Sequence, residues 1–133
     1  SAILMAMEVQ AVGIDISFAP VLDINNISDV IGDRAFHHQP DYVTELAEAF
    51  ISGLHVVGMK ATGKHFPGHG DTDTDSHLGL PIINKSKEAL TENELYPFQK
   101  LIDERVDSVM VGHLSVPALA NGEKISSSIS AYF

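Results

Sequence analysis

The stretch PDYVTELAEAFISGLHVVGMKATGKH, residues 40–65, contains the pattern that decides the fold. It opens with a proline, which suits the first turn of a helix, and its apolar residues then recur at spacings of three and four. These residues are Val43, Leu46, Ala47, Phe50, Leu54 and Val57. Gly58 is expected to end the helix, and residues 59–65 are a strand candidate. The stretch therefore predicts one helix followed by one strand.

Similar patterns precede this stretch. Residues 1–12 fit the end of an amphipathic helix, which Gly13 is expected to stop. Its apolar side is predicted to consist of Ile3, Leu4, Met7 and Ala11. Residues 16–23 form a short, mostly apolar run that suits a strand buried on both faces. Pro20 inside this run predicts an irregular strand or a bulge, because proline cannot donate to a ladder.

The C-terminal part of the sequence shows the same order of helix and strand. Thr91 and Glu94 have the spacing of a capping box, and the helix is expected to continue to about Arg105. Pro97 is expected to kink it, because the ring removes one backbone hydrogen bond. Residues 107–113 are the third strand candidate, and the rest of the chain is predicted to be loop with a helical turn.

Alternation of helix and strand predicts a parallel sheet, because each crossover returns the chain to the same edge. The longest loops, residues 24–39 and 67–85, follow strands, where parallel α/β folds carry their active sites. Three strands are too few to close a barrel and leave open edges. Residues 1–133 are therefore interpreted as a single piece of a larger α/β domain, with a small self-contained α/β sandwich as the alternative. Open edges also predict self-association of this piece.

The composition excludes several classes of protein. The 133 residues include 8 basic and 18 acidic side chains, and the formal net charge of −10 argues against nucleic acid as a partner, because phosphate binding needs clustered Lys and Arg. The absence of cysteine excludes a disulfide scaffold, a Cys-ligated zinc site and a thiol nucleophile. No apolar run reaches the ~18 residues of a membrane span, so no membrane partner is predicted.

Residues 64–77, KHFPGHGDTDTDSH, concentrate the side chains that can do chemistry, and they begin at the carboxyl end of a predicted strand. Asp75 and His77 are two residues apart, so in an extended loop they face the same side. The carboxylate can then accept the Nδ1–H of the imidazole. A histidine held in this way can give a proton to a leaving group and later take one from water. A solvated acidic loop with incidental histidines is the alternative.

A metal site is a second alternative for the same residues. His65 and His69 are four residues apart, as in a zinc-binding helix, but the Pro-Gly pair between them argues against a helix. The aspartates of the stretch begin like a calcium loop that then lacks the required glycine and glutamate. We therefore predict no metal and no cofactor, with a metal-dependent hydrolase that uses His65, His69, His77 and an aspartate as the rival hypothesis.

Other polar side chains lie in the first long loop or at predicted strand ends. Lys64 follows a buried-looking run, so its ammonium group is a candidate to reach into a cleft and bind sugar hydroxyls or a carboxylate. Arg34 fits either a surface ion pair with Asp29 or Asp33, or a multidentate donor to a polar ligand. Two further residues at strand ends stay open between a structural and a ligand-binding role, namely Asp23 and His113.

The motif of residues 64–71, together with Asp75-Ser-His77, resembles the signature of the family 3 glycoside hydrolases. More narrowly, it is similar to the bacterial β-N-acetylglucosaminidases of cell-wall recycling. Further matches are Phe18-Ala-Pro-Val-Leu-Asp23, Ile31-Gly-Asp-Arg-Ala-Phe36, Gly58-Met-Lys-Ala-Thr-Gly-Lys64 and Leu95-Tyr-Pro-Phe98. The resemblance covers nearly the whole chain. It implies that residues 1–133 are an internal fragment of a (β/α)8 TIM-type barrel, the N-terminal domain of such an enzyme, with about three βα units.

The resemblance also implies a function and residue roles. The parent enzyme is expected to remove terminal β-N-acetylglucosamine from muropeptides or other β-glycosides with retention of configuration. By the family pattern, His77 is the general acid/base and Asp75 is its partner, while Arg34, Lys64 and His65 hold the sugar. This departs from the usual pair of carboxylates.

The nucleophilic aspartate of the family lies beyond the last residue of this sequence, so the fragment alone is expected to be inactive. The same resemblance implies a cytoplasmic enzyme. Some relatives with a histidine acid/base transfer the sugar to phosphate, so a glycoside phosphorylase stays open beside a hydrolase. A non-catalytic carbohydrate-binding module is the remaining alternative.

Overall fold

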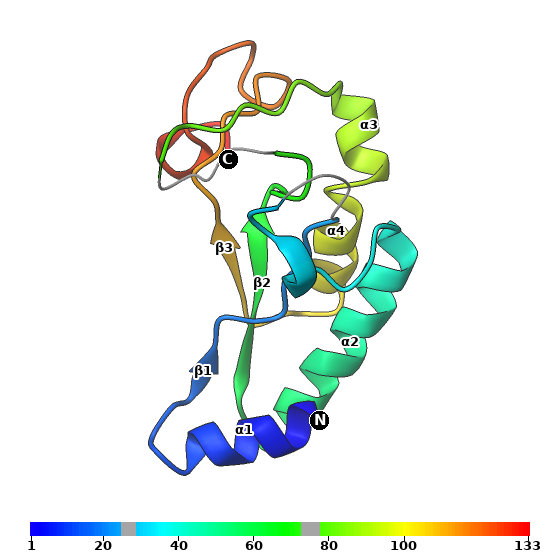
Figure 1. Ribbon diagram of the computed structural model, residues 1–133, viewed down its shortest axis with the longest axis vertical. Helices are drawn as coiled ribbons and strands as arrows, with labels where there is room; N and C mark the ends of the chain where they lie inside the picture. Colours follow the sequence, from blue (N-terminus) through cyan, green and yellow to red (C-terminus); the bar gives the residue numbers. More distant parts are fainter. Residues whose placement is uncertain (25–28, 73–77) are drawn as a thin grey trace.

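The computed structural model describes residues 1–24, 29–72 and 78–133. Figure 1 shows the strands running in the same direction, with helices α2 and α4 beside them and α1 near the end where they begin. The helices are α1 (Ala2–Gln10), α2 (Pro40–Val56), α3 (Lys87–Glu92) and α4 (Tyr96–Asp103), and the strands are β1 (Ile16–Ser17), β2 (Lys60–Phe66) and β3 (Ser108–Val111). Short 3-10 helices cover Gly32–Arg34 (η1) and Ser127–Ile129 (η2).

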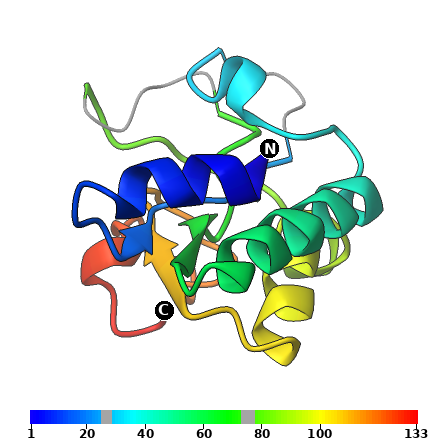
Figure 2. The ribbon, with the colours of Figure 1, turned by 90° about the horizontal axis from the view of Figure 1, so that it is seen from below.

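The sheet has the order β1-β2-β3, and both pairings are parallel. Ile16 pairs with Lys60, and Thr62 pairs with Ser108. Seen from below in Figure 2, α1 crosses the amino end of the strands. The predicted α/β class with parallel strands is therefore confirmed, and the arrangement is consistent with part of a barrel.

The pattern in residues 40–65 has the predicted outcome. Helix α2 begins at Pro40, and the chain turns into β2 through Gly58, whose φ is +79°. The main core is formed by Ala6, Leu22, Ala47, Ile51, Leu54, Met59, Ala61, Phe98 and Leu101. The assignment of Leu46 to the buried face of α2 was wrong, since its side chain is 46% exposed. Ile51, three residues before Leu54 and therefore on the same face of the helix, is buried although it was not predicted there.

The first helix, Ala2–Gln10, lies within the predicted residues 1–12 but ends earlier and has a different buried face. Only Ala6 of α1 is fully buried, and Val9 packs partly against the core. Leu4 and Met7, predicted on the apolar side, are 63% and 56% exposed. Gly53 lets α1 lie close to α2, because a Cβ at that position would lie 2.8 Å from Ala2 Cβ.

The irregular first strand is confirmed, but its predicted burial on both faces was wrong, since Ile16 is 52% and Phe18 62% exposed. Regular pairing of β1 ends at Ser17, and Val21 then forms an isolated parallel bridge to Lys64. Pro20 lies between them, and its carbonyl oxygen accepts from the backbone N–H of Lys64 at 3.1 Å. Proline therefore contributes an acceptor to this edge, where no donor is needed.

The prediction of a capping box at Thr91 was wrong. Helix α3 begins after Ser86, whose hydroxyl accepts from the N–H of Ala89, and Thr91 lies inside this helix with its hydroxyl bonded to the Lys87 carbonyl. Pro97 lies in the first turn of α4, where its missing N–H costs nothing, and the kink predicted there was wrong as well. Among the described residues, no helix is both long and apolar enough to cross a membrane.

Candidate functional site

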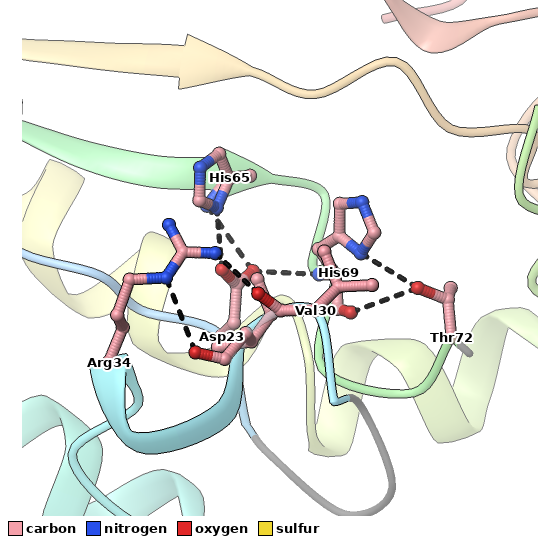
Figure 3. A network of polar contacts seen from close by, with 7 residues as sticks. Asp23, Val30, Arg34, His65, His69 and Thr72 are labelled. Carbon is pink, nitrogen blue, oxygen red and sulfur yellow. Dashed lines mark hydrogen bonds and ion pairs between the residues drawn. The ribbon is translucent and has the colours of Figure 1, made fainter. Parts of the chain in front are cut away.

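The carboxyl ends of β1 and β2 bring together polar side chains from distant parts of the sequence (Figure 3). Asp23 follows the irregular first strand, His65 is the penultimate residue of β2, and His69 follows β2 in the next loop. Arg34 belongs to η1 in the first long loop. Because the carboxyl ends of parallel strands meet at one edge, these residues converge although 46 positions separate Asp23 from His69.

Asp23 is the centre of this cluster. Its side chain is fully buried, and its Oδ2 lies 2.7 Å from Nδ1 of His65. Its Oδ1 accepts the backbone N–H groups of His69 at 2.7 Å and of His65 at 3.3 Å. These donors offset the loss of hydration of the carboxylate. Since a carboxylate only accepts, Nδ1 of His65 carries a proton, and Nε2 is left for a ligand.

His69 is held by a second set of bonds. The hydroxyl of Thr72 donates to the His69 carbonyl oxygen at 3.2 Å and lies 2.7 Å from Nδ1 of the same residue. Thr72 therefore contacts both the backbone and the imidazole ring of His69. Both residues are buried. The rings of His65 and His69 meet edge to face, with centroids 6.1 Å apart.

The two cations of the site are placed by different means. Arg34 donates from Nη2 to the Val30 carbonyl at 2.7 Å and from Nε to the Ile31 carbonyl at 3.3 Å, so its guanidinium group is oriented by its own loop. In the described part of the chain, it forms no ion pair with Asp29 or Asp33.

Burial lowers the pKa of Lys64 below its ordinary value, and the nearby Arg34 guanidinium lowers it further. The negative charge of Asp23 raises it, but by less. The opposing charge of Asp23 favours the ammonium form of Lys64. Lys64, Arg34 and Asp23 therefore share one electrostatic environment at the carboxyl end of the sheet. Such a combination of two cations and an oriented imidazole suits a polar, multidentate ligand.

The predicted site residues have three outcomes. Arg34, Lys64 and His65 come together around Asp23, and their contact with sugar stays a prediction. The predicted acid/base pair, Asp75 and His77, lies outside the described residues. His113 is separately hydrogen-bonded through Nδ1 to the Ser128 hydroxyl at 2.7 Å, which favours its structural interpretation.

The rival metal site also depends on His77, which is not described. Across residues 1–24, 29–72 and 78–133, no group of three or more His, Asp or Glu side chains is placed to hold a metal ion. His65 and His69 each have Nδ1 engaged in a hydrogen bond, to Asp23 and Thr72 respectively.

Sequence reasoning missed the part that Asp23, His69 and Thr72 play in this cluster. Asp23 was left open, and His69 was considered only as a metal ligand. The parallel register held a usable signal, because Val21 bridges to Lys64 and the residues just after both positions must meet at the same edge. The contact between Thr72 and His69 has no sequence pattern that would have predicted it.

This fold and site define an α/β protein with a cluster of charged and polar side chains at the carboxyl end of its parallel strands, where such folds carry their active sites. The profile of the Glycosyl hydrolase family 3 N terminal domain matches residues 1–131, so the chain belongs to glycosyl hydrolase family 3. It is 52% identical over 116 residues to a β-hexosaminidase of Idiomarina loihiensis, covering 87% of this chain and 35% of that protein. The chain thus spans about a third of the length of the curated relatives it matches.

Solved structures are similar as well. NagZ from Neisseria gonorrhoeae in complex with N-trifluoroacetyl-D-glucosamine has a TM-score of 0.87 at 41% identity, with 94% of this chain and 36% of that chain covered. A family 3 β-N-acetylglucosaminidase from a Paenibacillus species has a TM-score of 0.94 at 41% identity, with 98% and 25% covered. These likenesses extend over nearly all of the present chain and support its interpretation as part of a longer fold.

Proposed function

We propose that the full-length protein is a retaining glycoside hydrolase that removes terminal β-N-acetylglucosamine from peptidoglycan fragments. Family membership and the β-hexosaminidase relatives support the reaction class. The observation that carries the proposal is the imidazole of His65, oriented by buried Asp23 and accompanied by Lys64 and Arg34. A solved relative binds N-trifluoroacetyl-D-glucosamine, which supports an N-acylated glucosamine as the sugar.

In this proposal, the described site holds the sugar. The ammonium group of Lys64, the guanidinium group of Arg34 and Nε2 of His65 hydrogen-bond its hydroxyls. These charged and polar groups are already oriented before the sugar binds. Little side-chain entropy is therefore lost on binding, which strengthens it. The Asp23 carboxylate does not touch the sugar but fixes the ring of His65 through Nδ1.

The chemistry is assigned to residues outside the described ranges. His77 gives its proton to the glycosidic oxygen as a carboxylate nucleophile, supplied by chain beyond residue 133, attacks the anomeric carbon. His77 then takes a proton from water, which displaces the enzyme carboxylate from the sugar. Asp75 accepts the Nδ1–H of His77 and favours its protonated form.

The isolated 133-residue chain is proposed to be inactive because it lacks this nucleophile. It is also proposed to self-associate, since Ile16 and Phe18 at the edge strand are exposed. Size-exclusion chromatography of the isolated chain tests this, and a monomer at all concentrations would contradict it. A cytoplasmic location of the full-length protein, implied by the family resemblance, stays a prediction.

The test compares the full-length protein, its His77→Ala variant and the isolated chain on a chromogenic N-acetyl-β-D-glucosaminide. We expect turnover by the first, a loss of at least ~100-fold in the second and none in the third. Turnover by the isolated chain would contradict the missing-nucleophile argument. Full activity of His77→Ala would exclude its acid/base role. Analysis of the product in phosphate buffer separates hydrolysis from transfer to phosphate.

A further inference from the structure

A partly buried ionic cluster of Asp71, Lys85 and Glu94 lies beside the candidate site but is not part of it. Nζ of Lys85 is 2.5 Å from Oε1 of Glu94 and 2.6 Å from Oδ2 of Asp71. The Glu94 side chain is fully buried, and its Oε2 has no hydrogen-bond partner among the described residues. A buried carboxylate with one cation as its main partner is costly to keep, so stability alone does not account for it.

The cluster joins three separate parts of the chain. Asp71 lies in the loop after β2, Lys85 lies where the chain approaches α3, and Glu94 lies between α3 and α4. Burial tends to lower the pKa of Lys85, but its hydrogen bonds to Asp71 and Glu94 outweigh this and hold that pKa above its ordinary value. Lys85 is therefore a cation at neutral pH that holds both carboxylates at once.

The same loop is also fixed from its other side. The backbone N–H of His69 donates to Asp23 at 2.7 Å, and Thr72 is bonded to His69. A Cβ on Gly68 would lie 2.8 Å from Cβ of Glu94, so the loop packs directly on the residue that pairs with Lys85. Asp23 and the ionic cluster thus hold residues 68–72 at different points.

We propose that Lys85 and Glu94 are positioning residues, which fix Asp71 and so set the positions of the described residues that flank 73–77. This rests on the proposed function, in which that stretch supplies the proton donor. Within the described ranges, no hydrogen bond or ion pair joins Lys85 or Glu94 to Arg34, Lys64 or His65. Lys85 and Glu94 therefore serve proton transfer rather than sugar binding.

The experiment measures kcat and KM of the full-length enzyme on a chromogenic N-acetyl-β-D-glucosaminide. Lys85→Met is expected to lower kcat at least ~10-fold and to leave KM within ~3-fold, because only steps after binding are affected. Lys85→Arg, which can still span two carboxylates, is expected to recover most of kcat. Lys60→Met is the matched control, since it removes a lysine paired with Asp107 at the opposite end of the sheet and is expected to change neither constant.

Two further variants separate positioning from stability. Lys85→Met/Glu94→Gln removes the uncompensated buried charge, so it is expected to recover thermal stability but not kcat. Asp71→Asn leaves the pair of Lys85 and Glu94 intact. It tests the ion pair between Lys85 and the loop residue Asp71 if Lys85→Met does not fold. Recovery of kcat in the double variant, a rise in KM alone, or wild-type kinetics in Asp71→Asn would overturn the proposal. An inactive wild-type enzyme would instead contradict the proposed function.

Discussion

The two ends of the parallel sheet carry the same pair of groups in different surroundings. At the carboxyl end, Asp23 lies 2.7 Å from Nδ1 of His65, and at the amino end Asp107 lies 2.7 Å from Nε2 of His55. Each carboxylate also accepts backbone N–H groups, and for Asp107 the donor is Ala61 at 2.9 Å. The two sites thus share their hydrogen-bond chemistry.

Their exposure separates them. Asp23 is fully buried and His65 is 20% exposed, whereas Asp107 is 19% and His55 43% exposed. Asp107 also pairs with Lys60 at 3.0 Å, on the solvent side. A buried carboxylate strongly fixes its histidine, while a solvated one contributes mainly a modest ion pair. The comparison teaches that surroundings and position on the sheet, rather than the motif, favour the proposed ligand-binding role for the first pair and a stabilising role for the second.

Among the substitutions that test this comparison of the two ends, Asp23→Asn in the full-length enzyme is expected to have the largest effect. The amide presents a donor where His65 now donates from Nδ1, so the ring must adopt the other tautomer or turn away. Loss of this charged hydrogen bond predicts a fall in kcat/KM of ~10- to 100-fold. Nitrogen NMR shifts of the His65 imidazole report the tautomer directly.

Asp107→Asn is the matched control, and it is expected to leave kcat/KM within ~2-fold, since it changes the same contact at the amino end. Equal losses in the two variants would show that both pairs act only through stability and would break the comparison. An unchanged tautomer of His65 in Asp23→Asn would contradict the positioning role of Asp23.

A second pair of substitutions tests the backbone at the two ends. Gly68 has φ of +125°, and a Cβ there would lie 2.8 Å from Glu94 Cβ, whereas Gly58 has φ of +79° and open space around it. Gly68→Ala is therefore expected to destabilise by ~3 kcal/mol, and Gly58→Ala by ~1 kcal/mol. Urea unfolding of the full-length variants measures both values. Similar losses of stability in Gly68→Ala and Gly58→Ala would show that Glu94 can move away from a Cβ at position 68 at little cost.

Local patterns in the sequence predicted what depends on neighbours in the chain. The helix from Pro40 follows from its spacing of apolar residues, and the strand after Gly58 follows from the turn that ends that helix. Thr91 and Pro97 show the limit, because the helix cap is Ser86 and not Thr91, and Pro97 lies in the first turn of the separate helix α4 and not inside one long helix.

The candidate site shows the same limit. Lys64, His65 and Arg34 were found through a motif, and Asp23 was noticed only as a strand end. Its central place depends on the register between β1 and β2, which is set by pairing across more than 40 residues. Long-range contacts such as that of Lys85 with Asp71 and Glu94 have no local signature.

The smallest effect is expected at the amino end and depends on pH. Burial tends to raise the pKa of Asp107, but the Ala61 N–H, His55 and Lys60 together lower it from 3.8 to about 2. A lowered pKa in the folded state means that the stabilisation is complete above pH 3.8 and is lost as the pH falls toward 2. With allowance for solvent screening, this is worth about 1 kcal/mol.

Urea unfolding of wild type and Asp107→Asn between pH 2 and pH 6 measures this contribution, and the difference between them is expected to vanish near pH 2. Lys60→Met is expected to remove only a small share, because the bonds from Ala61 and His55 remain and the lysine is the most exposed partner. A difference that persists unchanged at pH 2 would show that Asp107 stabilises through its shape and not through its charge. In that case the Asp23–His65 and Asp107–His55 pairs would differ in the kind of interaction that stabilises them, and not only in their exposure to solvent.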